Sequence, residues 1–333
     1  MPKTTINTAQ QAEIVQELLK KLKTNYVFPE IANNLAESIH ERLTSGDYAS
    51  MFDGESFALA LTAHLQEANQ DKHLRVTWHA EPLGNDEDAE DQDDASDARE
   101  RARLINYCFR KIERLPGNVG IMNLTGFCPP DWAADTLAAA MAFLANMSAL
   151  IIDLRDCGGG DVTMVQVVCS YFFAKPTHLN DFYWRPDDST TQSWTIPCVP
   201  GERLPEVPLY ILTSNDTFSA GEGFAYTLQA LKRATIVGET TRGGAHPGGT
   251  HRLHPHMEVF IPSGRAINPI TGTNWEGTGV LPDVSASREG VLNEAYTRAL
   301  KDIRDGIDAT SSNAHRSLAK EISSALAGLE SKN

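Results

Sequence analysis

The chain has 333 residues, of which 41% are hydrophobic and 22% charged, as is ordinary for a soluble globular protein. Its formal net charge of −15 disfavours nucleic-acid and anionic-membrane partners, because like charges would repel. No apolar run is long enough to cross a bilayer, and the N-terminus lacks the apolar stretch of a secretory signal. We therefore expect a cytoplasmic protein whose five cysteines, with no CxxC pair among them, are free thiols.

The first 70 residues are predicted to form a small helical domain. Apolar side chains recur at helical spacing over 10–28, 31–43 and 56–70, and Phe28-Pro29 interrupts the first pattern. Residues 73–79 then alternate as a strand does. The acidic segment 85–97, within a loop expected over 85–100, holds too little apolar surface to order itself and is predicted to be solvated. A calcium loop is the alternative, although the glycine and terminal glutamate of an EF-hand are missing.

From residue 104 onward, strands and helices alternate. A hairpin is expected around Pro116-Gly117, and continuous apolar runs at 148–154 and 208–213 are typical of strands buried on both faces. Helices are predicted after these strands, over 131–147, 162–173 and 219–232. This order predicts an α/β core with a largely parallel sheet. A helical tail over 311–330 is expected to pack on the body or on a second copy of the chain.

Two strand-to-helix junctions carry the residues that suggest chemistry. Asp153–Gly160 ends in three glycines, whose backbone N–H groups can turn toward a ligand or simply form a tight turn. At the second junction, Ser219 stands where a helix is predicted to begin, so its hydroxyl is either a nucleophile or a helix cap. Glu222 in the first turn of that helix is expected to brace the junction.

The two junctions together resemble the S41 family of serine peptidases. The similarity rests on LIIDLRDCGGG, on LTSNDTFSAGEGFAYTLQALKRATIVGETTRGGAHP and on the closing motif TNWEGTGVLPDV. That family includes the tail-specific proteases, the tricorn core and the repeats of interphotoreceptor retinoid-binding protein. The chain is most similar to the last of these, which lack a PDZ domain. The resemblance implies a crotonase/ClpP-like catalytic core with Ser219 as nucleophile.

The resemblance also indicates which residue could act as the base. No lysine follows Ser219 at the distance used by tail-specific proteases, and arginine would not give up its proton. A tricorn-like arrangement implies His73 as the base and Glu276 as the group that supports it, although Lys72 stands where the family has serine. His246, in GGAHP, is the alternative base, and a strand-edge surface histidine is the plainer interpretation of His73.

The oxyanion hole is expected from the backbone N–H groups of Gly159 and Ala220. The family usually has asparagine where Cys157 stands, so the first loop departs from the pattern. No metal and no cofactor are predicted, because the histidines over 246–256 lack an HExxH arrangement.

The sequence thus predicts three parts: a helical domain over 1–70, a catalytic core over 71–308 and a helical tail over 309–333. The predicted reaction is peptide-bond hydrolysis through an acyl-enzyme, with a peptide or protein as substrate. Two alternatives stay open: a non-catalytic binder of retinoids or fatty acids, and an esterase that uses the same serine. Whether the chain forms a homo-oligomer is also open.

Overall fold

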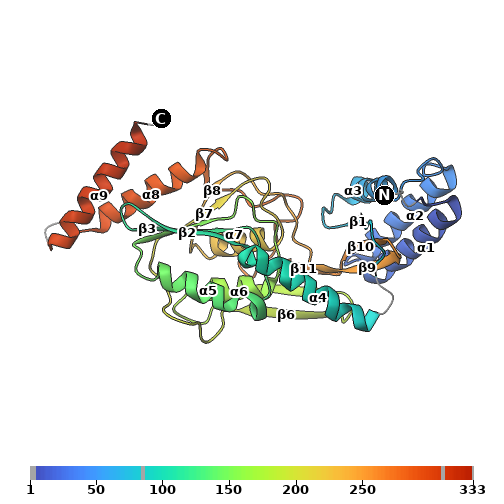
Figure 1. Ribbon diagram of the computed structural model, residues 1–333, viewed down its shortest axis with the longest axis horizontal. Coiled ribbons are helices and arrows are strands. Elements are labelled where there is room, and N and C mark those ends of the chain that lie inside the picture. The colour runs from blue at the N-terminus through green and yellow to red at the C-terminus, as the bar shows by residue number, and fades with distance from the viewer. Residues whose placement is uncertain (1–4, 84–86, 309–311, 332–333) are drawn as a thin grey trace. The chain divides into compact units, whose positions relative to one another are not determined.

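The computed structural model describes residues 5–83, 87–308 and 312–331 (Figure 1). Its contacts divide the chain into two compact units, and neither is continuous in sequence. The first unit contains Met1–Asp97, Asp181–Gln192 and Gly244–Ile267, and the second contains Ala98–Asn180, Ser193–Gly243 and Asn268–Asn333. The domain boundaries expected near residues 70 and 308 stay a prediction.

The predicted N-terminal helices are present in the first unit: α1 (Thr8–Asn25), α2 (Pro29–Ser45) and α3 (Gly54–Asn69). The Asn7 side chain caps α1 by accepting hydrogen bonds from Ala9 N and Gln10 N. Pro29 occupies the first position of α2, where its missing N–H costs nothing, and Gly46 ends that helix with φ of 86°. Local signals therefore set these helix ends.

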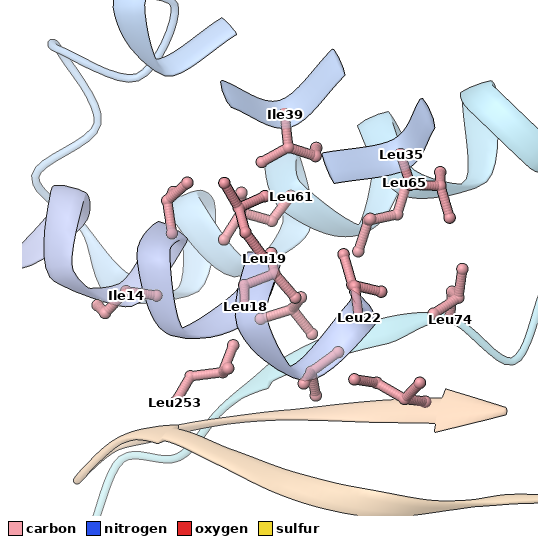
Figure 2. Packing of buried hydrophobic residues seen from close by; sticks show 14 of the residues in the cluster. Ile14, Leu18, Leu19, Leu22, Leu35, Ile39, Leu61, Leu65, Leu74 and Leu253 are labelled. Carbon is pink, nitrogen blue, oxygen red and sulfur yellow. The ribbon is translucent and has the colours of Figure 1, made fainter. Parts of the chain in front are cut away.

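The helices share one core with strands that come much later in the chain (Figure 2). Leu18 and Leu22 of α1, Ile39 of α2 and Leu61 of α3 are fully buried among each other and above a small antiparallel sheet. That sheet has the order β1-β10-β9, formed by β1 (Arg75–Trp78), β9 (Gly248–His254) and β10 (Met257–Pro262). Each buried leucine contributes roughly 1.5–3 kcal/mol, so the helices are held by the unit rather than by their own propensity.

The acidic segment is the clear correction to the sequence prediction. Residues 87–104 form helix α4 (Glu87–Leu104) instead of a solvated loop, while residues 85 and 86 lie outside the described residues. The prediction considered only how little apolar surface the segment could bury. Glutamate, alanine, glutamine and arginine are good helix formers, and the Glu100–Arg103 pair lies at i,i+3 spacing near the end of the helix.

The second unit contains a six-stranded sheet of order β12-β8-β7-β4-β3-β2. Only β2 runs antiparallel to its neighbour, in the predicted hairpin. The α/β class is therefore confirmed, as is the small helical region before it. The strands are β2 (Phe109–Leu115), β3 (Val119–Leu124), β4 (Ala149–Asp153), β7 (Leu209–Thr213), β8 (Thr235–Gly238) and β12 (Val284–Ser285). A separate sheet, with most of its residues in the first unit, has the order β11-β5-β6, with β5 (His178–Trp184), β6 (Ser189–Trp194) and β11 (Gly264–Ile267).

Helices of the second unit bury the sheet's apolar side chains. The remaining elements are the short η1 (Asn106–Cys108) and the helices α5 (Pro130–Leu144), α6 (Val162–Ser170), α7 (Ala220–Ala230), α8 (Val291–Gly306) and α9 (Asn313–Glu330). Helix α8 packs on β3, β4, β7 and β8, and the predicted tail α9 lies beside α8, where its Ile322 is buried (Figure 1). Among the described residues, no helix is both long and apolar enough to span a bilayer.

Candidate active site

The sheet brings the two predicted junctions together at one edge. Strands β4 and β7 are parallel neighbours with Asp153 opposite Leu212, so the loops that follow both strands leave from the same edge. Phe218 N donates to Cys157 O at 2.9 Å, and Thr217 Oγ1 donates to Leu154 O at 2.8 Å. The glycine loop and the serine loop therefore form one hydrogen-bonded structure.

Arg288, which follows β12, binds both of these loops. Its guanidinium donates to Ser214 Oγ at 2.8 Å and to Asp216 Oδ2 at 2.9 Å, and it also pairs with Asp156 on the glycine loop. In return, the Arg155 guanidinium donates to Arg288 O at 2.8 Å. Charge-assisted bonds from one side chain to two loops restrict the movement of one loop relative to the other.

Ser219 has a strained backbone at the start of α7. Its φ is 52° and its ψ is −120°, a region that a residue with a Cβ rarely occupies and that costs about 1–3 kcal/mol. In α/β-hydrolases, a strained strand-to-helix turn presents the nucleophilic serine. The side chain is half-buried, so it is not hidden in the core. Ser219 also forms a capping box with Glu222, and an ordinary cap requires neither the strain nor the partial exposure.

Gly159 lies directly against the serine. A Cβ built on Gly159 would stand 2.7 Å from Ser219 Cβ, 3.2 Å from Ser219 Oγ and 3.3 Å from Ala220 N. The φ of Gly159 is 109°, which also favours glycine. Phe127 N holds the loop by donating to Gly159 O at 2.8 Å. The structure thus places both predicted oxyanion donors, Gly159 and Ala220, next to the predicted nucleophile.

Glu222 braces this turn, as the sequence indicated. The carboxylate is fully buried, and its Oε2 accepts a hydrogen bond from Ser219 N at 2.8 Å. Its Oε1 accepts from Thr241 Oγ1 and from Gly243 N, both at 2.6 Å. Thr241 Oγ1 in turn accepts from Val280 N in the closing motif. One carboxylate therefore connects the serine, the segment after β8 and the closing motif.

Replacement of Glu222 by glutamine is expected to loosen this turn. The side-chain NH₂ group would face one of the present donors, and a buried donor without an acceptor costs about 1–3 kcal/mol. We expect the free energy of unfolding to fall by about 2–3 kcal/mol in chemical denaturation, with the exposed Glu289→Gln as the neutral control. Equal stability of the two variants would show that the carboxylate is not needed to hold the turn.

In the first unit, three polar residues converge on the buried carboxylate of Asp71. His246 Nδ1 and Tyr26 Oη each lie 3.0 Å from Asp71 Oδ2, and His73 N donates to Asp71 Oδ1 at 3.0 Å. The His73 ring is also close, with Nδ1 at 4.0 Å from Oδ1. Burial acts to raise the pKa of Asp71, but the hydrogen bond and charge of His246, with those of His73, outweigh burial and lower it.

The sequence interpretation missed Asp71 and Tyr26. Asp71 stands two residues before His73, the spacing at which an aspartate side chain commonly accepts a backbone N–H, and this was the one available local signal. Nothing in the sequence connects Tyr26 to Asp71, because 45 residues separate them. The view of His73 as a surface histidine is wrong, since its side chain is only 10% exposed.

Comparison with known proteins agrees with this architecture. Residues 118–286 match the sequence model of peptidase family S41, and residues 6–111 match that of the N-terminal domain of peptidase S41 in eukaryotic IRBP, the retinoid-binding protein. The chain belongs to peptidase family S41. A candidate tricorn protease homologue of Streptomyces coelicolor is 26% identical over 204 residues, which are 58% of this chain and 16% of that protein. The chain thus spans a small part of that relative's length.

Solved structures show the same fold at low identity. A candidate peptidase from Parabacteroides merdae gives a TM-score of 0.60 at 16% identity, covering 87% of this chain and 96% of its own. A lipoprotein from Streptococcus agalactiae gives 0.57 at 14% identity, with 88% and 96% covered. The tricorn protease gives 0.52 at 14% identity, with 94% of this chain and 37% of its own covered.

The predicted site residues of this S41 chain fall into both units. Ser219, Gly159, Ala220 and Glu276 belong to the second unit, whereas both candidate histidines belong to the first. Glu276 follows the buried Trp275, whose ring packs against Gly223 of α7. The backbone N–H of Glu276 donates to Asn274 Oδ1 at 2.9 Å. Support of His73 by Glu276 therefore stays a prediction.

Proposed function

We propose that this chain is a serine-type peptidase that hydrolyses peptide or protein substrates through an acyl-enzyme at Ser219. The observation that carries the proposal is the Ser219 turn: a strained serine at the start of α7, half-buried and in contact with Gly159. Strained backbone conformations of this kind cost stability and cluster at active sites, which supports a role for Ser219 in chemistry. Membership of family S41 supports the same reaction.

In the proposed reaction, Ser219 Oγ attacks the carbonyl carbon of the scissile bond while a histidine takes its proton. The N–H groups of Gly159 and Ala220 stabilise the resulting oxyanion. The neighbouring N–H groups of Gly158 and Gly221 donate to Thr125 O and Phe218 O. The Gly159 N–H acts on the Cys157 sulfur, a weak acceptor, so the oxyanion would have to replace that contact. The histidine then gives its proton to the leaving amine, and water hydrolyses the acyl-enzyme by the same route in reverse.

His73 is proposed as the base, with Glu276 as its support, because these residues match the histidine and glutamate of the tricorn-like pattern. The structure adds an observation that favours the rival, His246, whose Nδ1 hydrogen-bonds to Asp71 as an oriented general base would. Asp71 binds the backbone of His73 as well. Asp71 is thus proposed as the positioning residue for whichever ring takes the proton.

A fluorophosphonate probe, which reacts with activated serines, separates these roles. His73→Ala is expected to slow labelling of Ser219 by about 100-fold or more, the usual contribution of a general base. His246→Ala should slow it less, and the exposed His40→Ala on α2 should leave it unchanged. A loss confined to His246→Ala would move the base to that residue.

The same probe tests the proposal as a whole. No labelling of Ser219 in a folded sample would favour a non-catalytic binder of apolar ligands. Labelling together with hydrolysis of small esters, but of no peptide, would favour an esterase. Homo-oligomerisation and a cytoplasmic location are further proposals, which light scattering and cell fractionation test.

A further inference from the structure

Two of the five cysteines meet in the fold although 20 residues separate them in sequence. Cys108 Sγ lies 3.6 Å from Cys128 Sγ, and both side chains are half-buried. We propose that Cys108 and Cys128 are a modification site, which a hydroperoxide converts into a reversible disulfide that displaces the loop carrying Gly159. Formation of the disulfide stands by itself, whereas its effect on catalysis rests on the proposed function.

The backbone around the two sulfurs holds them close together. Thr125 N donates to Cys108 O at 3.0 Å, which fixes the start of the 125–128 segment beside Cys108. A Cβ at Gly126 would stand only 3.1 Å from Cys108 Sγ, so a side chain there would push the thiol away. Cys108 itself has φ of 69°, a conformation uncommon for a residue with a Cβ and one that its surroundings must maintain.

The two thiols have different roles in the proposed oxidation. Burial, and then the neighbouring Cys108, raise the pKa of Cys128 to about 12, which disfavours Cys128 as the first thiol to react and leaves the first attack to Cys108. Cys108 first releases its proton, and its thiolate attacks one oxygen of hydrogen peroxide. The O–O bond breaks, a sulfenic acid forms, and the leaving hydroxide takes up the released proton to become water. Cys128 sulfur then attacks that sulfenic sulfur, the S–S bond forms, and a second water leaves with the Cys128 proton. Two thiols are oxidised by two electrons, and one peroxide is reduced to two waters.

The 125–128 segment is hydrogen-bonded to the glycine loop beside Ser219. Thr125 O accepts from Gly158 N at 3.2 Å, while Phe127 donates to Gly159 O at 2.8 Å and accepts from Asp161 N at 2.7 Å. A disulfide bond is about 2.05 Å long, so the sulfurs must approach by on the order of 1–2 Å. Because Phe127 precedes Cys128 directly, we expect that movement to shift the Gly159 loop against Ser219.

The other three cysteines are poorly placed to form this disulfide in place of Cys108 and Cys128. Cys157 and Cys169 are buried, and Cys198 is exposed. Burial raises the pKa of Cys157 to about 12 although the backbone N–H of Gly159 acts in the opposite direction, so this thiol stays protonated. Cys198 therefore provides an accessible single thiol for a control variant.

The test treats the folded, reduced protein with hydrogen peroxide and maps the products by mass spectrometry without reduction. We expect one crosslinked peptide pair that joins Cys108 to Cys128, with loss of two hydrogen atoms per chain and full recovery on adding dithiothreitol. Cys128→Ser should abolish the crosslink and leave Cys108 as a sulfenic acid that dimedone traps, whereas Cys198→Ser should keep the crosslink. Sulfinic or sulfonic acid at Cys108 without a crosslink in the wild type would overturn the proposal.

Activity is then measured before and after oxidation in the same samples. We expect the fluorophosphonate labelling rate of the wild type to fall by about tenfold and to return on reduction. A misplacement of a catalytic group by about 1 Å can cost on the order of 100-fold, and the sulfur movement reaches Gly159 only through the 125–128 segment. Cys128→Ser should keep its rate under the same treatment. A crosslink without any change in labelling rate would show that the disulfide does not affect the Gly159 loop. A reduced wild type that never labels would instead count against the proposed function.

Discussion

Ser219→Ala is expected to reduce peptide hydrolysis by about 10⁴–10⁶-fold and to eliminate fluorophosphonate labelling, because no other group replaces the attacking oxygen. The fold should survive the change. Alanine keeps the Cβ that already occupies the strained φ of 52° and the backbone N–H that donates to the Glu222 carboxylate, and it loses only the side-chain half of the capping box. We expect the free energy of unfolding to fall by about 0.5–2 kcal/mol, the usual cost of losing a serine cap. Labelling, peptidase activity and chemical denaturation on one preparation check these values.

Ser214→Ala is the matched control in the same loop. Ser214 is buried, and its Oγ donates to Arg155 O at 2.6 Å and accepts from Arg288, so its removal should cost about 1–2 kcal/mol of stability. It should still label at Ser219. Hydrolysis that persisted in Ser219→Ala, or labelling that disappeared only with Ser214→Ala, would show that the nucleophile is misassigned.

Gly159→Ala is expected to have the second largest effect. The new Cβ would stand 2.7 Å from Ser219 Cβ, closer than such atoms approach, and φ of 109° is unfavourable for alanine. The loop must therefore move away from the serine, and its N–H group with it. Loss of one oxyanion donor typically lowers kcat by about 100–1,000-fold, so we expect a fall of that size in kcat with a smaller change in KM.

Gly158→Ala provides a control one residue away. A Cβ at Gly158 would meet nothing within 4 Å, and its backbone is not in the positive-φ region. Activity within about threefold of the wild type is expected, because substitutions that meet no contact or strain usually change little. If Gly159→Ala matched Gly158→Ala in kcat, the proposed role of the glycine loop would be wrong.

Much of the fold could be predicted from sequence because its signals are local. The buried strands β4 and β7 appear as continuous apolar runs, and the ends of α1 and α2 follow from Asn7, Pro29 and Gly46. The α4 helix shows where such reasoning fails. Composition indicated that the acidic segment has few apolar side chains, but intrinsic helix propensity does not depend on burial and favours a helix.

The candidate site was also predictable only in part. The Ser219 turn, its glycine loop and the bracing Glu222 all lie at strand-to-helix junctions, so a short stretch of sequence identifies each of them. The sequence ranked His73 above His246 only through the resemblance to the tricorn-like pattern, because the carboxylate that binds His246 is distant along the chain. His246 and Asp71 are 175 residues apart, and only the folded first unit brings them within 3.0 Å.

The sequence alone determined the α/β class and the S41 family, and it predicted Ser219 as the nucleophile, since each depends on residues that are neighbours along the chain. Tertiary structure decided that Glu222 connects Ser219 to Thr241 and Gly243, that Asp71 binds His246, and that Cys108 meets Cys128. The physical reason is that a hydrogen bond or a sulfur contact depends on distances of a few ångströms. Sequence spacing does not specify those distances until the chain is packed.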